Sequence, residues 1–500
     1  MHHFIFPNQD TWISSGSSKI DGTSFKDQNF GRDQILEIKK EFFNNSFDHQ
    51  TRALVQFSGT DFTELSKSVA DGTITNPKYY LRLYEAEGNA EIQGDYTLAV
   101  EPISQSWTEG TGKFGDRPKN TNGCSWENRN NPTGGTSNQW NTQTSVGNTF
   151  ASGTLTISNG NFTNQEITIG GVDFIFVSGS PSVFDNNSSE IFVESGSSRQ
   201  ITVNNLTGSI NDNFSTHGLN ITASVGNTGE VILSGSSAGT IANLSFATST
   251  TLFSIDGDSS EALEGGTDTI TSVDGNGPSI LSVSSSTQTF SNQSPDVEVE
   301  VTNMVNMWLQ GQHSNYGMQV RFSGSQETDT ETFGHLKFFS RNTHTIYQPK
   351  LEVRWDDHLP CTGSNTGSLT ELTMSGLADN FLYMRGLREE YREGERVKFR
   401  VGARKRYIQK TFSTSVQTVT GSFITEGRGF YAIKDIATDE FIVPFSSYTS
   451  MSCDTNGMYF NQWMDGFYPD RVYKFQLKLK YDDGQEQVFD DDFEFIVKRK

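Results

Sequence analysis

The feature that most restricts the fold of this 500-residue chain is a period-two alternation of apolar and polar residues, repeated in short runs along its length. The clearest run is RVYKFQLKLK, in which Tyr473, Phe475, Leu477 and Leu479 alternate with Lys and Gln. Successive side chains of a β-strand point to opposite faces, so these runs predict strands with one buried face. Turn residues separate the runs, and we therefore expect an all-β protein.

The composition fits many short strands arranged around several hydrophobic cores. The chain holds 47 Gly, which suits tight turns, and 12% of its residues are aromatic, which gives it groups able to bury surface. At about 150 residues per domain, this length predicts roughly three domains.

Three compositional zones predict the domain boundaries. Residues 1–150 and 286–357 carry charged and aromatic strand patterns and are expected to form one discontinuous β-sandwich. Residues 151–285 are rich in Gly, Ser, Thr and Asn with few basic residues, and are expected to form an inserted β-rich domain, with a flexible linker as the alternative. Residues 358–500 predict a C-terminal, immunoglobulin-like β-domain.

A few shorter elements are predicted among the strands. Apolar residues at spacings of three and four predict short helices at 62–69, 206–214 and 302–309. Thr302 is expected to cap the third helix, with Val305 and Trp308 facing inward. Residues 167–179 predict a hairpin that turns at Gly170-Gly171.

The net charge and the apolar runs exclude some classes of protein. The 38 Lys and Arg against 60 Asp and Glu give a formal charge of -22, the wrong sign for a generic nucleic-acid backbone binder. No apolar run approaches about 18 residues, so no membrane span is expected. The N-terminal segment has no basic region followed by a long apolar run, so no secretory leader is expected.

The three cysteines are too few and too far apart to predict a disulfide framework or a zinc site. Cys124, Cys361 and Cys453 form no CxxC pair. This pattern is typical of a protein made in a reducing cytoplasm and stabilised by its cores and interfaces.

Seven short motifs occur in the order found in the DNRLRE family. They are an opening resembling ADTYISS, an N-F-G turn, an R-A-L-V-x-F strand, an L-R-L-Y strand, a W-T-E-G segment, a strand leading to a W-L helix and a closing P-K-L-x-V strand, at residues 10–15, 29–31, 52–57, 81–84, 107–110, 297–309 and 349–353. The resemblance implies a jelly-roll β-sandwich similar to carbohydrate-binding modules of surface and phage proteins. It also implies that Glu109 of W-T-E-G is structural and accepts backbone donors.

The other two zones resemble phage proteins. The middle zone is similar to small β-rich modules of phage tail proteins, through its hairpin at 167–176, its helix at 206–214 and its strands at 221–224 and 231–235. The domain order and the segments FRVGARKRY and GFYPDRVYKFQLKLKYDDG resemble virion structural proteins of tailed phages that infect marine cyanobacteria. This resemblance implies a virion protein assembled in the host cytoplasm.

No catalytic or metal-binding constellation stands out in the sequence. His2-His3 is interpreted as incidental, because no HxxxH, HExxH or HxH spacing accompanies it. A glycosidase acid pair of Glu109 with Asp116 or Glu127 is the less favoured alternative to the structural role of Glu109. The acidic clusters near the C-terminus lack the spacing of a calcium loop and are interpreted as solvated. We therefore expect no enzyme activity and no cofactor.

Basic residues concentrate between positions 388 and 410. The candidate docking surface consists of Arg388, Arg392, Arg396, Lys398, Arg400, Arg404, Lys405, Arg406 and Lys410. In an acidic chain this asymmetry indicates a surface that docks to an acidic neighbour, which includes another copy of the same chain. The alternative is that these residues form the solvated face of a strand pair.

Two classes of function follow from these observations. The first is a structural virion component of the tail, baseplate or neck, whose partners are other virion proteins and copies of itself in a symmetric assembly. The second is an adhesion protein that binds host surface glycan. Trp126, Trp140 and Tyr316 fall in loop-like contexts and are the candidate glycan contacts.

Overall fold

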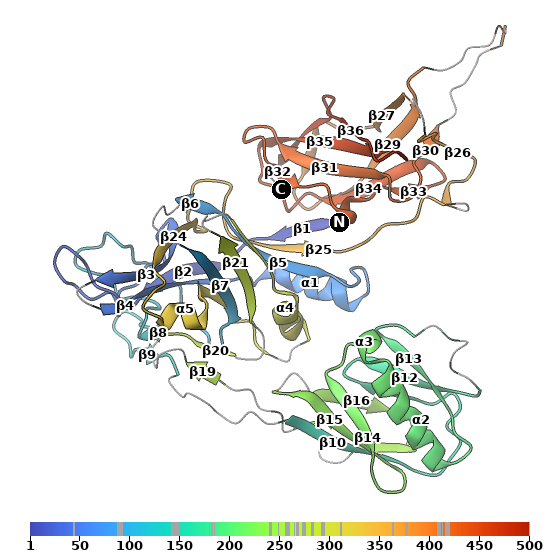
Figure 1. The fold of residues 1–500 in the computed structure, drawn as a ribbon, viewed down its shortest axis with the longest axis horizontal. Helices are drawn as coiled ribbons and strands as arrows, with labels where there is room; N and C mark the ends of the chain where they lie inside the picture. The colour runs from blue at the N-terminus through green and yellow to red at the C-terminus, as the bar shows by residue number, and fades with distance from the viewer. Residues whose placement is uncertain are drawn as a thin grey trace.

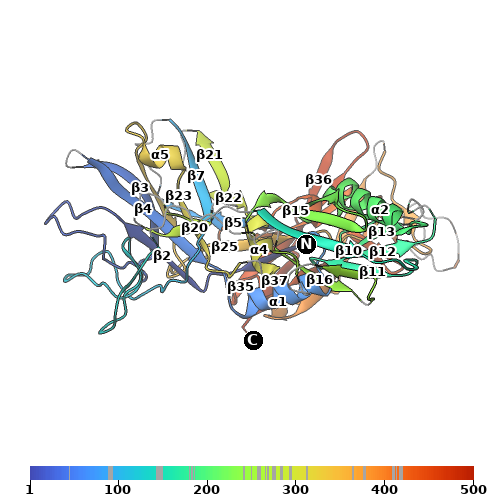
Figure 2. The same ribbon diagram turned by 90° about the horizontal axis from the view of Figure 1, so that it is seen from below.

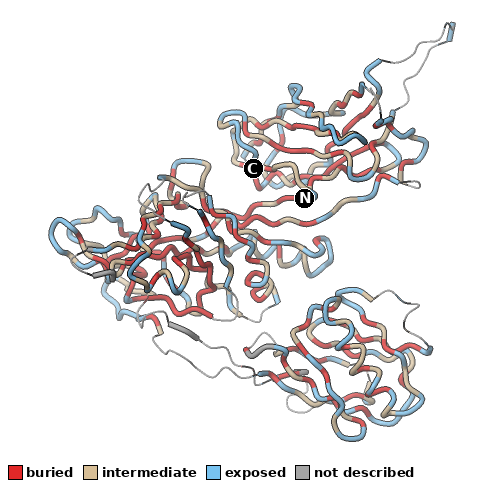
Figure 3. The backbone as a smooth tube through the Cα atoms, viewed as in Figure 1, coloured by how far each residue is buried: buried red, intermediate tan, exposed pale blue. Residues whose placement is uncertain are grey.

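The computed structural model shows three bodies, each with its own hydrophobic core (Figure 1, Figure 2). It describes residues 1–499 except 44–45, 88–93, 142–149, 180, 182–183, 185, 240–242, 249, 256–260, 265, 267–269, 273–276, 282–284, 292–295, 311–312, 363–364, 376–378, 408–411, 413 and 416–420. Buried residues gather inside each body (Figure 3). The protein is all-β in class, as the alternation predicted.

The first sandwich is built from two sheets that enclose one core. One sheet has the order β1 (His2–Ile5), β25 (Lys350–Arg354), β5 (Lys78–Leu83), β22 (Val297–Glu300). The other has the order β21 (Ser286–Ser291), β7 (Asp95–Pro102), β23 (Met318–Phe322), β4 (Ser46–Gln56), β3 (Ile35–Phe43), β24 (Gly334–Phe339), β6 (Glu85–Glu87), with β2 (Gln9–Ser14) paired to β4. Strands from residues 1–150 and from residues 286–357 are thus interleaved in both sheets.

Strand β4 is covered on both faces, whereas the alternation predicted one buried face. Ala53 and Val55 face the core between the sheets, and Leu54 lies in a second cluster with Ile13 and Trp107 on the opposite face. The rest of that second cluster comes from the loops after β7, which include β8 (Asn128–Asn130) and β9 (Asn138–Gln139). The prediction was wrong here because the loops that cover the outer face of β4 are distant in sequence. The alternation within β4 gives no sign that they cover it.

Short helices pack against the first sandwich. They are α1 (Thr60–Ala70), α4 (Thr302–Leu309) and α5 (Gly324–Thr328). The predicted helices at 62–69 and 302–309 are confirmed, and Val305 and Trp308 are buried. The predicted cap is wrong: Thr302 is already helical, and its hydroxyl accepts a hydrogen bond from the Tyr79 amide.

The inserted unit, residues 150–264, folds around its own core. Its sheets have the orders β14 (Ile221–Val225), β15 (Glu230–Ala238), β10 (Phe150–Ile157), β17 (Phe253–Ile255) and β13 (Glu190–Glu194), β12 (Val172–Val177), β11 (Glu166–Ile169), β16 (Leu244–Thr248), β18 (Glu261–Leu263). The predicted hairpin at Gly170-Gly171 is confirmed as β11–β12. Helix α2 (Arg199–Asp212) buries Leu206 and Ile210, but Phe214 starts the separate α3 (Phe214–His217) and is exposed.

The chain enters and leaves the inserted unit at one place on the first sandwich. The Asn141 carbonyl accepts a hydrogen bond from the Ser279 hydroxyl, and Ile103 bridges to Ile280. Strands β19 (Ile270–Ser272) and β20 (Ser279–Leu281) pair with each other at this junction. The segment around 279–281 therefore contacts the first sandwich, although the composition grouped it with the insert.

The C-terminal sandwich also has two sheets around one core. One has the order β26 (Thr370–Glu371), β30 (Ser422–Phe423), β29 (Arg396–Lys405), β34 (Gly457–Trp463), β33 (Ser452–Asp454), with β27 (Asn380–Arg385) paired to β29. The other has the order β28 (Glu390–Arg392), β37 (Glu494–Lys498), β35 (Arg471–Lys480), β31 (Gly429–Asp435), β32 (Phe441–Val443), with β36 (Glu486–Phe489) paired to β35 and a 3₁₀ turn at Ser447–Thr449. The alternation in β35 is confirmed: Tyr473, Phe475, Leu477 and Leu479 are buried.

Strand β1 joins the first sandwich to the C-terminal sandwich. It pairs with β25, yet the Phe4 ring lies in the core of the C-terminal sandwich. His2 is fully buried between the two, with Nδ1 2.5 Å from a Glu352 oxygen and Nε2 3.2 Å from the Ser446 hydroxyl. His2 therefore has a structural role that the sequence did not show, because its imidazole bridges two bodies.

Candidate functional site

The candidate site is the outer face of β29 and its neighbours in the C-terminal sandwich. Val397, Phe399 and Val401 point inward, and the even-numbered residues between them point outward, as predicted. The register places Arg385 of β27 beside Arg400. We call Arg385, Arg396, Lys398, Arg400 and Arg404 the basic face.

Aromatic rings lie under several of these cations. The Lys398 ammonium is 3.9 Å from the centroid of Tyr459, and the Arg404 guanidinium is 5.0 Å from that of Phe381. Arg396 lies 5.3 Å from the Trp463 centroid. Such cation–π contacts hold flexible basic side chains flat on the sheet, so their charges are positioned before any partner arrives.

One carboxylate, Asp454 of β33, pairs with the basic face. It accepts hydrogen bonds from both terminal nitrogens of Arg400, at 2.6 and 2.8 Å. This bond is the main cause that raises the pKa of Arg400, and it likewise lowers the pKa of Asp454. Among the described residues, Arg396 and Arg404 have no carboxylate within salt-bridge distance, so their charge remains available.

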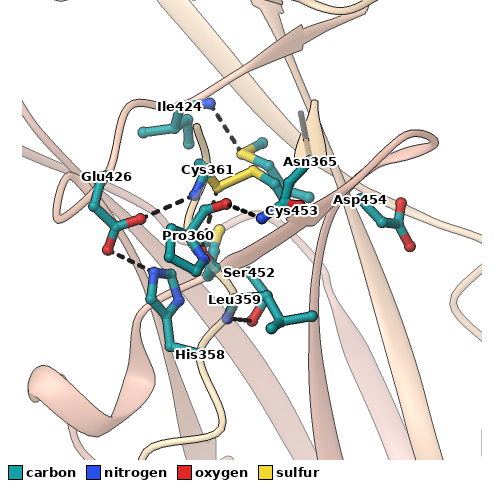
Figure 4. Close-up of a disulfide and its surroundings, with 12 residues drawn as sticks. His358, Leu359, Pro360, Cys361, Asn365, Ile424, Glu426, Ser452, Cys453 and Asp454 are labelled. Carbon is teal, nitrogen blue, oxygen red and sulfur yellow. Dashed lines mark hydrogen bonds and ion pairs between the residues drawn. A yellow bond between two sulfur atoms is a disulfide. The ribbon is translucent and has the colours of Figure 1, made fainter. Parts of the chain in front are cut away.

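A disulfide fixes the edge strand that carries Asp454. Cys361 and Cys453 are bonded, and Figure 4 shows the bond beside Ser452 and Asp454. The Glu426 carboxylate accepts a hydrogen bond from the Cys361 amide, and the Ser452 hydroxyl accepts one from the Leu359 amide. The expectation of unpaired thiols was wrong for these two cysteines, because the fold brings together residues that are 92 positions apart. Cys124 is a buried free thiol.

The structure separates the residues that the sequence grouped as one docking surface. Arg396, Arg400 and Arg404 share the basic face, whereas Arg392 belongs to β28 in the opposite sheet. Arg388 leads into that sheet and pairs with Glu395 at 2.5 Å.

The C-terminal end of the basic run is only partly on the face. Lys405 and Arg406 lie at the end of β29, where Arg406 pairs with Asp379 at 3.2 Å. Lys410 falls outside the described residues. The grouping by sequence overlooked Arg385, because only the pairing of β27 with β29 shows that it belongs to the face.

The candidate glycan contacts do not form an exposed platform. Trp126 and Trp140 are each 3% exposed and pack in the cluster over the outer face of β4. The Arg52 guanidinium covers the Trp126 ring at 4.4 Å, and the Trp140 indole donates to the Ser125 carbonyl. Tyr316 is half-buried against the same cluster. The two tryptophans proposed as glycan contacts therefore lie in loops but are buried, so they offer no exposed ring to a sugar.

Glu109 has the structural role that the family resemblance implied. Its carboxylate accepts a hydrogen bond from the Asp10 amide at 3.1 Å and two from Arg341 at 2.6 and 2.9 Å. Asp116 instead accepts a hydrogen bond from the Lys113 amide. Both carboxyls thus have backbone partners, which does not favour an acid pair.

No group of three or more His, Cys, Asp or Glu within the described part of the chain is arranged to hold a metal ion. Within the same residues, no helix is long and apolar enough to cross a membrane.

The structure thus defines an all-β protein with several β-sheet bodies, one of which carries the basic face. No family model, curated protein or solved structure matches the chain.

Proposed function

We propose that this chain is a non-enzymatic structural protein of a tailed-phage virion, placed in the tail, baseplate or neck. It works through protein–protein contacts between several identical copies and with other virion proteins. The sequence resemblance to virion proteins supports a place in a phage particle. The basic face supports a function through protein–protein contacts.

The single observation that carries this proposal is a basic face on an acidic molecule. Residues 358–500 contain 19 basic and 20 acidic residues, although the whole chain has a formal charge of -22. Five of the basic residues are aligned on adjoining strands. A preorganised positive surface attracts an acidic partner, accelerates its encounter and fixes its orientation.

We expect reversal of charge at the end of β29 to block incorporation into particles. The variant carries Arg404→Glu, Lys405→Glu and Arg406→Glu, and mass spectrometry of purified particles measures its copy number against the wild type. The matched control reverses Lys19, Lys26 and Lys113 of the first sandwich. Normal incorporation of the β29 variant would reject this surface, and absence of the wild-type protein from particles would reject the virion role.

A glycan-binding adhesion protein is the second candidate, and one groove favours it. Loops at 116–122 and 131–135 line a cavity of about 650 Å³ on the first sandwich. Its wall carries the amides of Asn120, Asn122 and Asn131, groups that hydrogen-bond sugar hydroxyls. Binding of host surface glycan on an array, lost in Asn120→Ala/Asn131→Ala, would support this function.

A further inference from the structure

We infer that the partner of the basic face is the inserted unit of a second copy of this chain. The inference rests on the proposed function, because it names the neighbour that the basic face would bind. It starts from a second sheet face, on β11, β12 and β13, whose charge is opposite.

The outer face of the sheet β13–β12–β11 is acidic. Ile167, Phe174 and Ile191 point into the core, so their neighbours along each strand point outward. The register aligns these neighbours across the sheet, with Asp173 beside Glu190. We call Glu166, Asp173, Glu190 and Glu194 the acidic face.

The centre of the acidic face is apolar and partly open. Ile175 and Phe192 are neighbours in the register and are half-buried. Phe184 stacks on Phe192 with centroids 4.7 Å apart and remains 40% exposed. An apolar centre with a charged rim is the usual anatomy of a protein interface.

The acids of the inserted unit have few basic residues near them in the sequence, although Asp173 and Glu190 accept hydrogen bonds from the neutral side chains of Thr168 and Asn187. Residues 151–285 contain 13 acidic residues and one basic residue, Arg199. In the portion of the chain that the structure describes, none of these acids forms an ion pair, whereas most basic residues of the first sandwich do. The unit therefore has a net negative charge that favours binding to a positively charged surface.

The basic face supplies charge of the opposite sign on another sheet face. Phe381 and Tyr383 of the neighbouring strand lie beside Arg404 and Gly402 on this face, so it also presents aromatic surface. Figure 1 shows the inserted unit and the C-terminal sandwich separated from each other, so the contact joins two molecules. Because two different surfaces meet, the contact is heterologous and propagates into a ring or a filament.

Sedimentation velocity of the full-length chain tests this contact. We expect the wild type to self-associate at low ionic strength and to dissociate as salt is added, because screening weakens contacts between charged faces. Lys398→Glu/Arg404→Glu and, separately, Glu190→Lys/Glu194→Lys should each weaken association about tenfold or more. Lys26→Glu/Lys113→Glu is the control for the first variant, since both lysines are exposed and the change in net charge is the same.

Mixing the two variants separates a heterologous contact from general charge repulsion. The first variant retains a wild-type acidic face and the second a wild-type basic face. An equimolar mixture should therefore associate again, because each face of one variant meets a face of opposite charge on the other. A chain carrying all four substitutions should self-associate again, because both faces are reversed together.

Three results would overturn the inference: a wild type that stays monomeric at low salt, single-face variants that associate normally, or a mixture that remains monomeric. Failure of this contact can be distinguished from failure of the proposed function. A protein found in particles but monomeric in solution keeps the virion role and loses this contact. A protein that self-associates through both faces but is absent from particles keeps the contact and loses the virion role.

Discussion

Several charged side chains of the first sandwich are buried, and each is held by a partner distant in sequence. Arg52 is fully buried and donates two hydrogen bonds to Glu327, which also accepts one from Arg321. Removing one member of such a network leaves an unpaired buried charge, which costs about 3–5 kcal/mol. These networks fix the position of the loops over the outer face of β4.

Asp10 is the buried carboxyl with the weakest compensation. One of its oxygens accepts a hydrogen bond from the Arg341 amide at 2.6 Å, and the other, Oδ1, has no partner among the described residues. Burial raises the pKa of Asp10 to about 7. The folded state therefore holds a proton that the unfolded chain releases near pH 4.

We expect Asp10→Asn to remove a pH dependence of stability. Because the pKa is raised on folding, the stabilising contribution of Asp10 is present below pH 4 and is lost as the pH rises to about 7. The wild type should therefore lose about 3 kcal/mol relative to the variant between pH 5 and pH 8. Urea unfolding followed by tryptophan fluorescence measures this, since six of the seven Trp lie in the first sandwich. Parallel stability profiles for the two proteins would contradict the expectation.

The sequence could predict that Trp107, Trp126 and Trp140 lie in loops, but not that those loops fold back over the sheet. Exposure depends on contacts between distant segments, such as the indole of Trp107 donating to the Tyr316 carbonyl. The structural role of Glu109 was implied by the family resemblance, although its partners Asp10 and Arg341 are distant in sequence. The environment of Asp10 was not, because Arg341 is 331 residues away.

At the scale of strands and helices, periodicity predicted much of the fold. Strands β22, β29 and β35 follow the predicted alternation and α1 follows its apolar spacing, whereas β25 is buried on both faces. The pairing of strands could not be predicted from the sequence. Alternation indicates which face of a strand is buried, but not which strand lies beside it. Arg385 and the Cys361–Cys453 bond both depend on such pairings.

The basic face also depends on one glycine in β29. Tyr383 lies over Gly402, and a Cβ added at Gly402 would come within 2.3 Å of the tyrosine ring. A methyl group there must displace the ring, which lies between Phe381 and Arg385 on the same strand.

We expect Gly402→Ala to destabilise the C-terminal sandwich by about 1–3 kcal/mol through this overlap. In the Tyr383→Ala background the same substitution should cost much less, because the obstructing ring is gone. A double-mutant cycle by denaturant unfolding, with far-ultraviolet circular dichroism as the signal, measures the coupling. Equal costs in both backgrounds would show that the ring is not the cause.

The whole molecule separates its charge by body, and this was only partly visible in the sequence. Composition predicted a middle zone poor in basic residues and a basic run at 388–410. It did not predict that acids would align on one sheet face of the inserted unit and cations on one face of the C-terminal sandwich. Both alignments arise from registers that only the folded chain shows.

The inserted unit should be removable without unfolding the rest. The Asn141 carbonyl and the Ser279 hydroxyl are hydrogen-bonded, so a short Gly-Ser linker in place of 150–266 can close the gap. We expect the shortened chain to keep the unfolding midpoint of the first sandwich, measured by tryptophan fluorescence, and to lose self-association. An insoluble product would contradict the expectation that the rest of the chain folds without the inserted unit. Unchanged self-association would contradict the expectation that this unit binds the basic face.

The position of β1 also determines the order in which the protein can fold while it is being made. This strand pairs with β25, and His2 and Glu352 are 350 residues apart. On the ribosome, the first sandwich cannot fold completely until β25 has left the exit tunnel. Phe4 can enter the core of the C-terminal sandwich only later, when that sandwich has also been synthesised. All strands of the inserted unit lie between residues 150 and 263, so the middle of the chain is the first part able to complete a fold. Synthesis thus runs from end to end, whereas folding starts at the centre and finishes by joining the earliest residues to some of the last.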